Sequence, residues 1–109
     1  MNGGYVKIAR GIFKHNMFKD EPFTEREAWI WLICGASYKD DTIRIPNTNI
    51  VTKIKRGEYM ASYRFLATKF KWPISRVKRV IERFKSGLML TTRVEQGITF
   101  ITIENYDEY

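Results

Sequence analysis

Two short helical segments separated by a three-residue turn constrain the fold of this 109-residue chain more than any other feature of its sequence. Ser62, a preferred helix N-cap residue, precedes a helix expected over residues 63–70. Pro73 suits the first position of a second helix, which we expect to continue to about Lys85, where a Ser-Gly pair ends it. Because only residues 71–73 connect them, the two helices must pack against each other as a helix-turn-helix.

Two strand-like segments follow this pair of helices. Residues 88–94 and 98–103 alternate apolar and polar side chains, and Glu95-Gln96-Gly97 between them is a typical hairpin turn. A helix-turn-helix followed by a β-hairpin is the order of elements in a winged helix. In that fold the second helix enters the major groove of DNA and the hairpin is the wing.

A further helix is expected nearer the N-terminus. Thr24 and Glu27 have the spacing of a capping box, and the helix that follows, about Glu25–Tyr38, is apolar nearly all round, which indicates burial on most sides. Residues 5–9 alternate and are expected to form a short strand or an extended lead-in. A helical turn is expected to carry a group of apolar anchors, namely Ile12, Phe13, Met17 and Phe18.

A second, shorter hairpin is expected before the helix-turn-helix. Its strands are predicted over residues 42–45 and 50–54, and residues 59–61 return as a strand after a turn in which Gly57 takes a positive φ. The sequence therefore predicts one α+β domain over residues 1–109. We expect a winged helix-turn-helix with three or four helices, a C-terminal hairpin wing and this second short hairpin before helix two.

Positive charge is concentrated in the second half of the chain. Residues 53–85 hold eleven basic and two acidic residues, a formal charge of +9. The rest of the chain holds eight basic and ten acidic residues, a charge of −2, within a total of +7. A one-sided positive field attracts polyanions, so double-stranded DNA is the expected partner.

The helix expected over about 73–86 has the two faces that a major-groove helix requires. Its apolar sector contains Ile74, Val77, Val80, Ile81 and Phe84, and the opposite sector contains Ser75, Arg79, Glu82, Arg83 and Ser86. An arginine fork can bind guanine O6 and N7, and cations on the flanks can bind phosphates. The alternative is an ordinary solvated surface, but Glu82 is the only acid between Lys69 and Lys85.

We expect the DNA contacts to come from this helix, from its neighbour and from the wing over about 89–103. Arg93 is a candidate for a minor-groove or phosphate contact by the wing. Lys53, Lys55 and Arg56 on the other hairpin either extend the positive surface or only keep an edge soluble. The candidate DNA-binding residues are Ser75, Arg76, Lys78, Arg79, Arg83, Arg64, Lys71 and Arg93.

The composition gives little support to an enzyme. With Cys34 as the one cysteine and His15 as the one histidine, neither a disulfide, a zinc centre nor a Ser-His-Asp set is expected, and no cofactor or metal is predicted. No signal peptide and no apolar run of membrane-spanning length are visible, so we expect a cytoplasmic protein that does not bind membranes. Trp72 is expected to be a core residue that fixes the turn angle.

Motifs along nearly the whole chain resemble one family. They are Gly4-Tyr5-Val6-Lys7-Ile8, Phe18-Lys19-Asp20, Glu27-Ala28-Trp29-Ile30-Trp31-Leu32, Ile54-Lys55-Arg56-Gly57-Glu58, Leu66-Ala67-Thr68-Lys69-Phe70-Lys71-Trp72, Arg76-Val77-Lys78-Arg79, Gly87-Leu88-Met89 and Ile103-Glu104-Asn105-Tyr106-Asp107-Glu108-Tyr109. In order and spacing they resemble phage replication proteins of the replisome-organiser and DnaD-like primosome type. Pro73 departs from the pattern, which prefers a Ser N-cap there.

The resemblance implies a winged-helix domain that binds DNA at a phage or prophage origin in a bacterial host cell and helps to recruit a helicase loader. Two alternatives stay open. The first is a phage-encoded transcriptional regulator, and the second is a protein-interaction module that uses the winged-helix surface. Replication or transcription proteins are candidate partners. A homodimer is a further candidate, because winged helices often bind DNA in pairs.

Overall fold

A three-stranded antiparallel sheet forms the centre of the protein. The structure is a computed structural model, and it describes residues 4–109. The strands β3 (Glu58–Met60), β4 (Leu90–Glu95) and β5 (Ile98–Ile103) are arranged in the order β3–β5–β4. The last strand in sequence therefore lies in the middle, with Tyr59 opposite Ile101 on one side and Thr92 opposite the same residue on the other.

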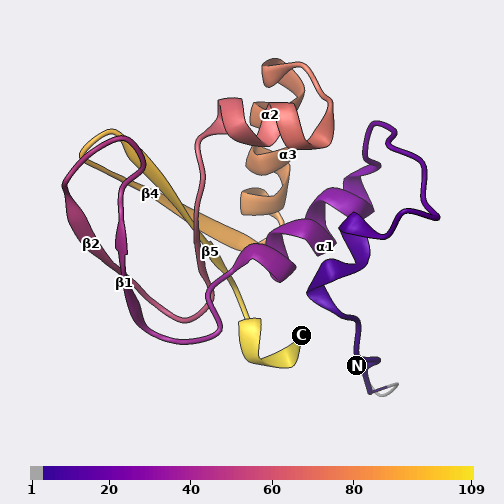
Figure 1. Cartoon of the computed structure of the whole chain (residues 1–109), viewed down its shortest axis with the longest axis horizontal. Helices are drawn as coiled ribbons and strands as arrows, with labels where there is room; N and C mark the ends of the chain where they lie inside the picture. The colour runs from indigo at the N-terminus through magenta and orange to yellow at the C-terminus, as the bar shows by residue number, and fades with distance from the viewer. Residues whose placement is uncertain (1–3) are drawn as a thin grey trace.

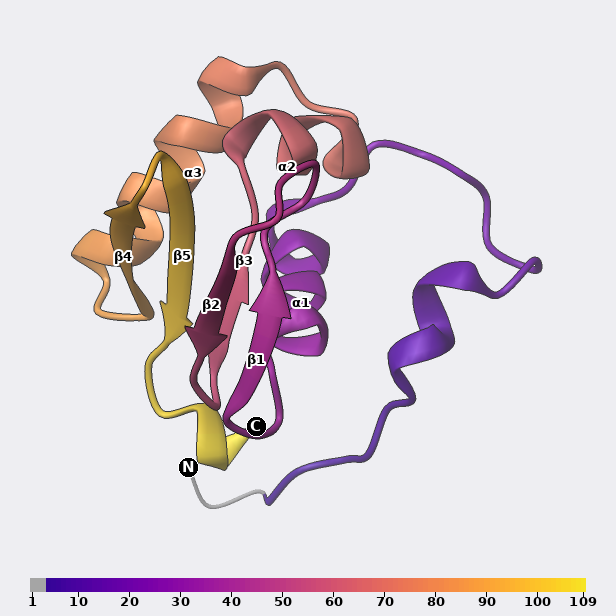
Figure 2. The same ribbon diagram turned by 60° about the vertical axis from the view of Figure 1, so that its left-hand side comes forward.

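Three helices cover one face of this sheet (Figure 1; Figure 2). They are α1 (Glu25–Gly35), α2 (Tyr63–Phe70) and α3 (Ile74–Ser86). Their buried side chains meet those of β4 and β5 in one hydrophobic core. Its large side chains that are completely buried are Leu32, Leu66, Phe70, Val77, Val80, Ile81, Leu90 and Ile101. Burial of this apolar surface is the main force that holds the helix pair against the sheet.

The expected caps of the first two helices are confirmed. The Thr24 side chain accepts a hydrogen bond from the backbone N–H of Glu27, and the Glu27 side chain accepts one from the backbone N–H of Thr24. The Ser62 hydroxyl likewise accepts from the backbone N–H of Phe65. Each cap satisfies backbone donors that the first helical turn leaves free, which typically stabilises a helix by about 1 kcal/mol.

A separate hairpin lies between α1 and β3 in the sequence. Its strands are β1 (Asp41–Arg44) and β2 (Val51–Ile54), paired in antiparallel fashion as the sequence predicted. The turn into β3 contains Gly57, whose φ of 87° confirms the expected positive value. A Cβ at Gly57 would lie 3.1 Å from the Cβ of Tyr106, so the C-terminal segment packs directly on this turn.

The N-terminal segment extends along the side of α1 away from the sheet (Figure 2). It contains one 3-10 helix, η1 (Arg10–Lys14), and no strand forms over residues 5–9, so the extended lead-in was the correct alternative. The segment joins the body at Phe23, whose ring stacks on Phe70 and whose backbone N–H donates to the Phe70 carbonyl. Of the four apolar anchors, only Phe13 is half-buried.

Several other expectations need correction. Helix α1 ends at Gly35 rather than near Tyr38, because the chain turns there towards the hairpin. Only Ala28 and Leu32 of α1 are fully buried, so the prediction that this helix is buried on most sides is wrong. Pro73 is the N-cap of α3 in an extended conformation, one residue before the helix begins.

No helix within residues 4–109 is long and apolar enough to cross a membrane.

Candidate nucleic-acid interface

The exposed face of α3 carries the predicted recognition residues. Val77, Val80, Ile81 and Phe84 are buried against the core, which turns the opposite face of the helix to solvent. Ser75, Lys78 and Arg79 are exposed near its N-terminal end. Across the described part of the chain, none of these three side chains forms an ion pair or a hydrogen bond. All three are therefore available to an external anion.

Ile74 differs from its predicted place in the apolar sector. It is the first residue of α3 and remains 43 % exposed, because no preceding helical turn covers it. The exposed end of α3 therefore combines an aliphatic side chain with a hydroxyl and two cations. This is a suitable set for a DNA major groove, where thymine methyl groups and guanine acceptors lie side by side.

Arg76 is held in place by the turn between α2 and α3. Its guanidinium carbon lies 4.1 Å from the centroid of the Trp72 indole, a distance typical of a cation–π contact. Trp72 is itself 5 % exposed, and its Nε1 donates a 2.8 Å hydrogen bond to the carbonyl of Phe23. The expectation that Trp72 is a core residue is therefore confirmed, and its ring also orients one of the predicted DNA contacts.

Two further predicted residues are engaged in ion pairs at the surface. The Arg83 guanidinium lies 2.7 Å from a carboxylate oxygen of Glu25 in the first turn of α1. The Lys71 ammonium lies 2.9 Å from the carboxylate of Asp20. Arg64 on α2 is exposed, and its side chain makes no ion pair within residues 4–109. To contact DNA, Arg83 would have to leave Glu25 and Lys71 would have to leave Asp20. Breaking these pairs costs little, because ion pairs at the surface contribute little stability.

Arg93 lies in the middle of β4 opposite Phe100, and its side chain is already bound within the protein. Its Nε donates to the carboxylate of Glu58 at 3.1 Å, its Nη1 pairs with Glu95, and its guanidinium carbon lies 4.0 Å from the Phe100 centroid. The hydrogen bond to Glu58 raises the pKa of Arg93 above its usual value. Arg93 is thus engaged within the sheet, and contact with DNA would require it to leave Glu58 and Glu95.

The tip of the β4–β5 hairpin is short and uncharged apart from Glu95. Gln96 and Gly97 have φ values of 52° and 77°, the pair of left-handed residues that a tight hairpin turn requires. With Arg93 engaged further down the strand, this hairpin presents no cation without a carboxylate partner over the described residues 90–103. Thr91 and Gln96 remain exposed for polar contacts.

Arg56 on the approach to β3 is also neutralised internally. Its Nε lies 2.7 Å from a carboxylate oxygen of Asp107, and its guanidinium carbon lies 5.1 Å from the Tyr106 ring centroid. Cations within the +9 block of residues 53–85 therefore differ in their surroundings. Arg56, Lys71 and Arg83 meet acids from distant parts of the chain, as Arg93 does outside the block. Arg64, Lys78 and Arg79 face solvent.

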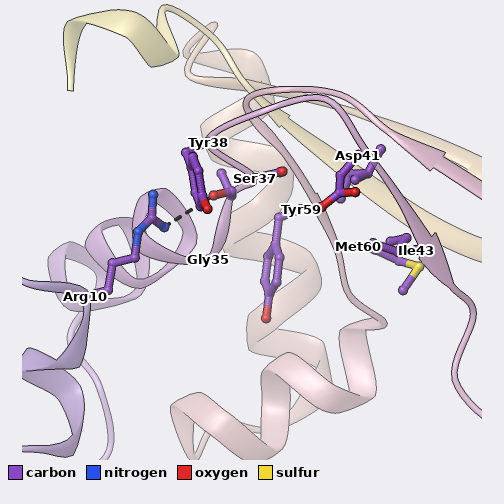
Figure 3. Close-up of a pocket in the computed structure, with 10 residues that line it drawn as sticks. Arg10, Gly35, Ser37, Tyr38, Asp41, Ile43, Tyr59 and Met60 are labelled. Atoms are coloured by element: carbon purple, nitrogen blue, oxygen red, sulfur yellow. Dashed lines mark hydrogen bonds between the residues drawn. The ribbon is translucent and has the colours of Figure 1, made fainter.

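A cavity of about 350 Å³ lies between the end of α1, the β1–β2 hairpin and β3 (Figure 3). Arg10 borders it, with its guanidinium donating to the carbonyls of Cys34 and Ala36. Burial raises the pKa of Tyr59, which lines the same cavity. The described residues contain no group of three His, Cys, Asp or Glu side chains that could hold a metal ion.

No protein-family model, curated protein sequence or solved structure matches this chain.

Proposed function

We propose that this protein is a winged-helix domain that binds double-stranded DNA, with α3 as the recognition helix. The order of the sheet supports the winged helix, because β3 precedes the helix pair and then lies beside β5 of the hairpin that follows it. The observation that carries the DNA assignment is the exposed end of α3, where Ser75, Lys78 and Arg79 face solvent without internal partners among the described residues.

The electrostatics of α3 favour phosphate and base contacts over contact with a neutral surface. Ser75 is in the first turn, where the helix N-terminus carries partial positive charge and attracts phosphate. Arg79 is one helical turn further along on the same face and presents the planar fork that binds guanine. Lys78 is beside it as a point charge suited to a phosphate.

The biological setting proposed is replication initiation by a phage or prophage, as the resemblance of the sequence motifs implies. A phage-encoded transcriptional regulator would use the same face of α3, so the two differ in target site rather than in contact chemistry. Selection of bound sequences from a random duplex pool, followed by sequencing, identifies the site. A palindromic product would indicate that two copies bind together.

A matched pair of charge variants tests DNA binding by α3. Lys78→Gln/Arg79→Gln removes two exposed cations from α3, and Lys7→Gln/Lys14→Gln removes two exposed cations from the N-terminal segment. Fluorescence anisotropy with a labelled duplex should show roughly tenfold or greater loss of affinity for the α3 variant at about 0.1 M salt. The slope of log K against log salt should fall by about 1.8, at about 0.9 per phosphate contact.

The control variant should retain wild-type affinity and slope. Glu82→Gln provides a change of opposite sign, because Glu82 is an exposed acid on the face proposed to meet phosphates, and its removal should tighten binding. Equal behaviour of the two double variants would refute the assignment of α3, and duplex affinity that does not respond to salt would refute DNA binding as such.

A protein-interaction module is the second candidate, and the N-terminal segment is the observation that favours it. Tyr5, Val6, Met17 and Phe18 are each at least 65 % exposed, although large apolar side chains on one segment are usually covered by something. Docking of a protein through these side chains would depend little on salt. Deletion of residues 4–9, which removes Tyr5 and Val6, would then weaken complex formation while leaving duplex binding by α3 unchanged.

A further inference from the structure

The β1–β2 hairpin has one face towards the protein and one face towards solvent. In its register Thr42 lies opposite Lys53 and Arg44 lies opposite Val51. Directly opposite residues in an antiparallel pair share a face, as do residues two apart in one strand. These four side chains therefore lie together, and all four are exposed.

The other face of the hairpin holds it against the body. Ile43 and Ile54 line the cavity beneath the hairpin together with Tyr59 and Met60 of β3 (Figure 3). Ile54 is 7 % exposed. The outer face is thus fixed in orientation by apolar contacts on the inner one.

The charges of the hairpin are unbalanced on this outer face. The sequence from Thr42 to Gly57 contains four basic residues and no acid. At the base of the hairpin, Asp40 accepts a hydrogen bond from the backbone N–H of Arg56, and Asp41 accepts one from the backbone N–H of Thr42. Arg44 and Lys53 form no ion pair with any residue that the structure describes.

The hairpin points to the same end of the molecule as the proposed recognition elements. Figure 1 and Figure 2 both show its tip on the side of the molecule that carries the tip of the β4–β5 hairpin. In Figure 2 the first turn of α3 lies at that end as well. The β4–β5 tip lacks an unpaired cation because Arg93 is bound to Glu58 and Glu95, whereas the neighbouring hairpin offers two.

We propose that the outer face of the β1–β2 hairpin binds the phosphate backbone of the same DNA duplex that α3 contacts, through Arg44 and Lys53. This inference rests on the proposed function. The hairpin acts as a second wing that supplies the charge missing from the first. Its contacts are with phosphates and carry no sequence information, so they contribute affinity and register while α3 determines the preferred site.

The test compares three double variants of the full chain on one duplex. Arg44→Gln/Lys53→Gln removes the hairpin charges, Lys78→Gln/Arg79→Gln removes those of α3, and Lys7→Gln/Lys14→Gln is the matched control. All six side chains are exposed, and circular dichroism verifies that each variant is folded. Anisotropy titrations at several salt concentrations give the affinity and the salt slope.

The hairpin variant should lower the salt slope by about 1.8 and weaken binding to random and preferred duplexes by the same factor. The α3 variant should weaken the preferred duplex more than the random one. Hydroxyl-radical footprinting should show that the hairpin variant loses protection at backbone positions that the α3 variant still protects.

The possible failures are distinguishable. Loss of duplex binding in the α3 variant, with no change in the hairpin variant beyond that of the control, would overturn the second wing and leave the proposed function intact. Absence of salt-dependent duplex binding by the wild type would overturn both. If the hairpin variant instead loses only the capture of an acidic protein partner, its outer face is a protein-docking surface and the phosphate assignment is wrong.

Discussion

Glu58 is the most enclosed charged residue among those that the structure describes. Its residue is 4 % exposed, and its two carboxylate oxygens accept from the backbone N–H of Lys55 and from the Arg93 side chain. It therefore connects the turn before β3 to the middle of β4, across the central strand. This one carboxylate links β3 and β4, which are not neighbours in the sheet.

Replacement of Glu58 by Ala should destabilise the domain by about 2–3 kcal/mol. The change leaves a backbone donor and a half-buried guanidinium without an acceptor, and loss of one partner of an enclosed pair costs more than loss of a surface pair. Urea unfolding followed by tryptophan fluorescence measures the effect. Glu95→Ala is the control, because Glu95 is the exposed partner of Arg93 and its loss should cost under about 0.5 kcal/mol. Equal losses in the two variants would show that Glu58 is not a structural link.

At the scale of elements, the turn between α2 and α3 depends on one indole. Lys71 closes α2 in a left-handed conformation with φ of 58°, Trp72 enters the core, and Pro73 is the N-cap of α3. The indole N–H of Trp72 donates to the carbonyl of Phe23. Trp72 therefore fixes the turn and also binds the segment that precedes α1.

Trp72→Phe should therefore lower the free energy of unfolding by about 1–2 kcal/mol, because an aromatic ring remains but the Phe23 carbonyl loses its side-chain donor. The urea midpoint reports the change, and an unaltered m-value would show that the variant remains compact. Trp31→Phe is the matched control, since the Trp31 indole donates no hydrogen bond within the described residues and its ring is only half-buried. A larger loss for Trp31→Phe would contradict this account of the turn.

Helices α2 and α3 were predictable because the signals that mark their ends are local. Ser62 and the breaks around Pro73 and Gly87 mark their ends, and the bounds of α2 agree with the prediction. The acids with which the basic side chains pair were not predictable in the same way. Arg83 pairs with Glu25 and Arg93 pairs with Glu58, residues that are far apart in sequence and are brought together only by the folded chain. A charge count therefore located the basic half, but could not separate free cations from neutralised ones.

Long-range hydrogen bonds and buried side chains are unevenly distributed over the molecule. The N-terminal segment makes backbone hydrogen bonds mainly between near neighbours on exposed chain, such as the Ile12 N–H to the Ala9 carbonyl. The first long-range backbone bond in this part of the protein is that of Phe23 to Phe70. Helix α3 and strand β5, by contrast, contain seven of the seventeen buried hydrophobic side chains.

Amide hydrogen exchange should follow this division. Backbone amides over residues 4–22 should exchange within seconds to minutes, while those of α3 and β5 should exchange only through unfolding of the domain, because local opening costs least where buried contacts are few. Exchange followed by peptic digestion and mass spectrometry measures both regions in one sample. Protection of residues 4–22 equal to that of α3 would mean that another molecule covers this segment in solution.

The place of β5 at the centre of the sheet also sets the timing of folding during synthesis. Both neighbours of β5 precede it in the chain, so neither β3 nor β4 has its partner until residues 98–103 have left the ribosome. Until then the nascent helices have no completed sheet to cover, and their apolar faces remain open to chaperones and proteases. A translation pause at any codon that follows those of α3 would lengthen that interval.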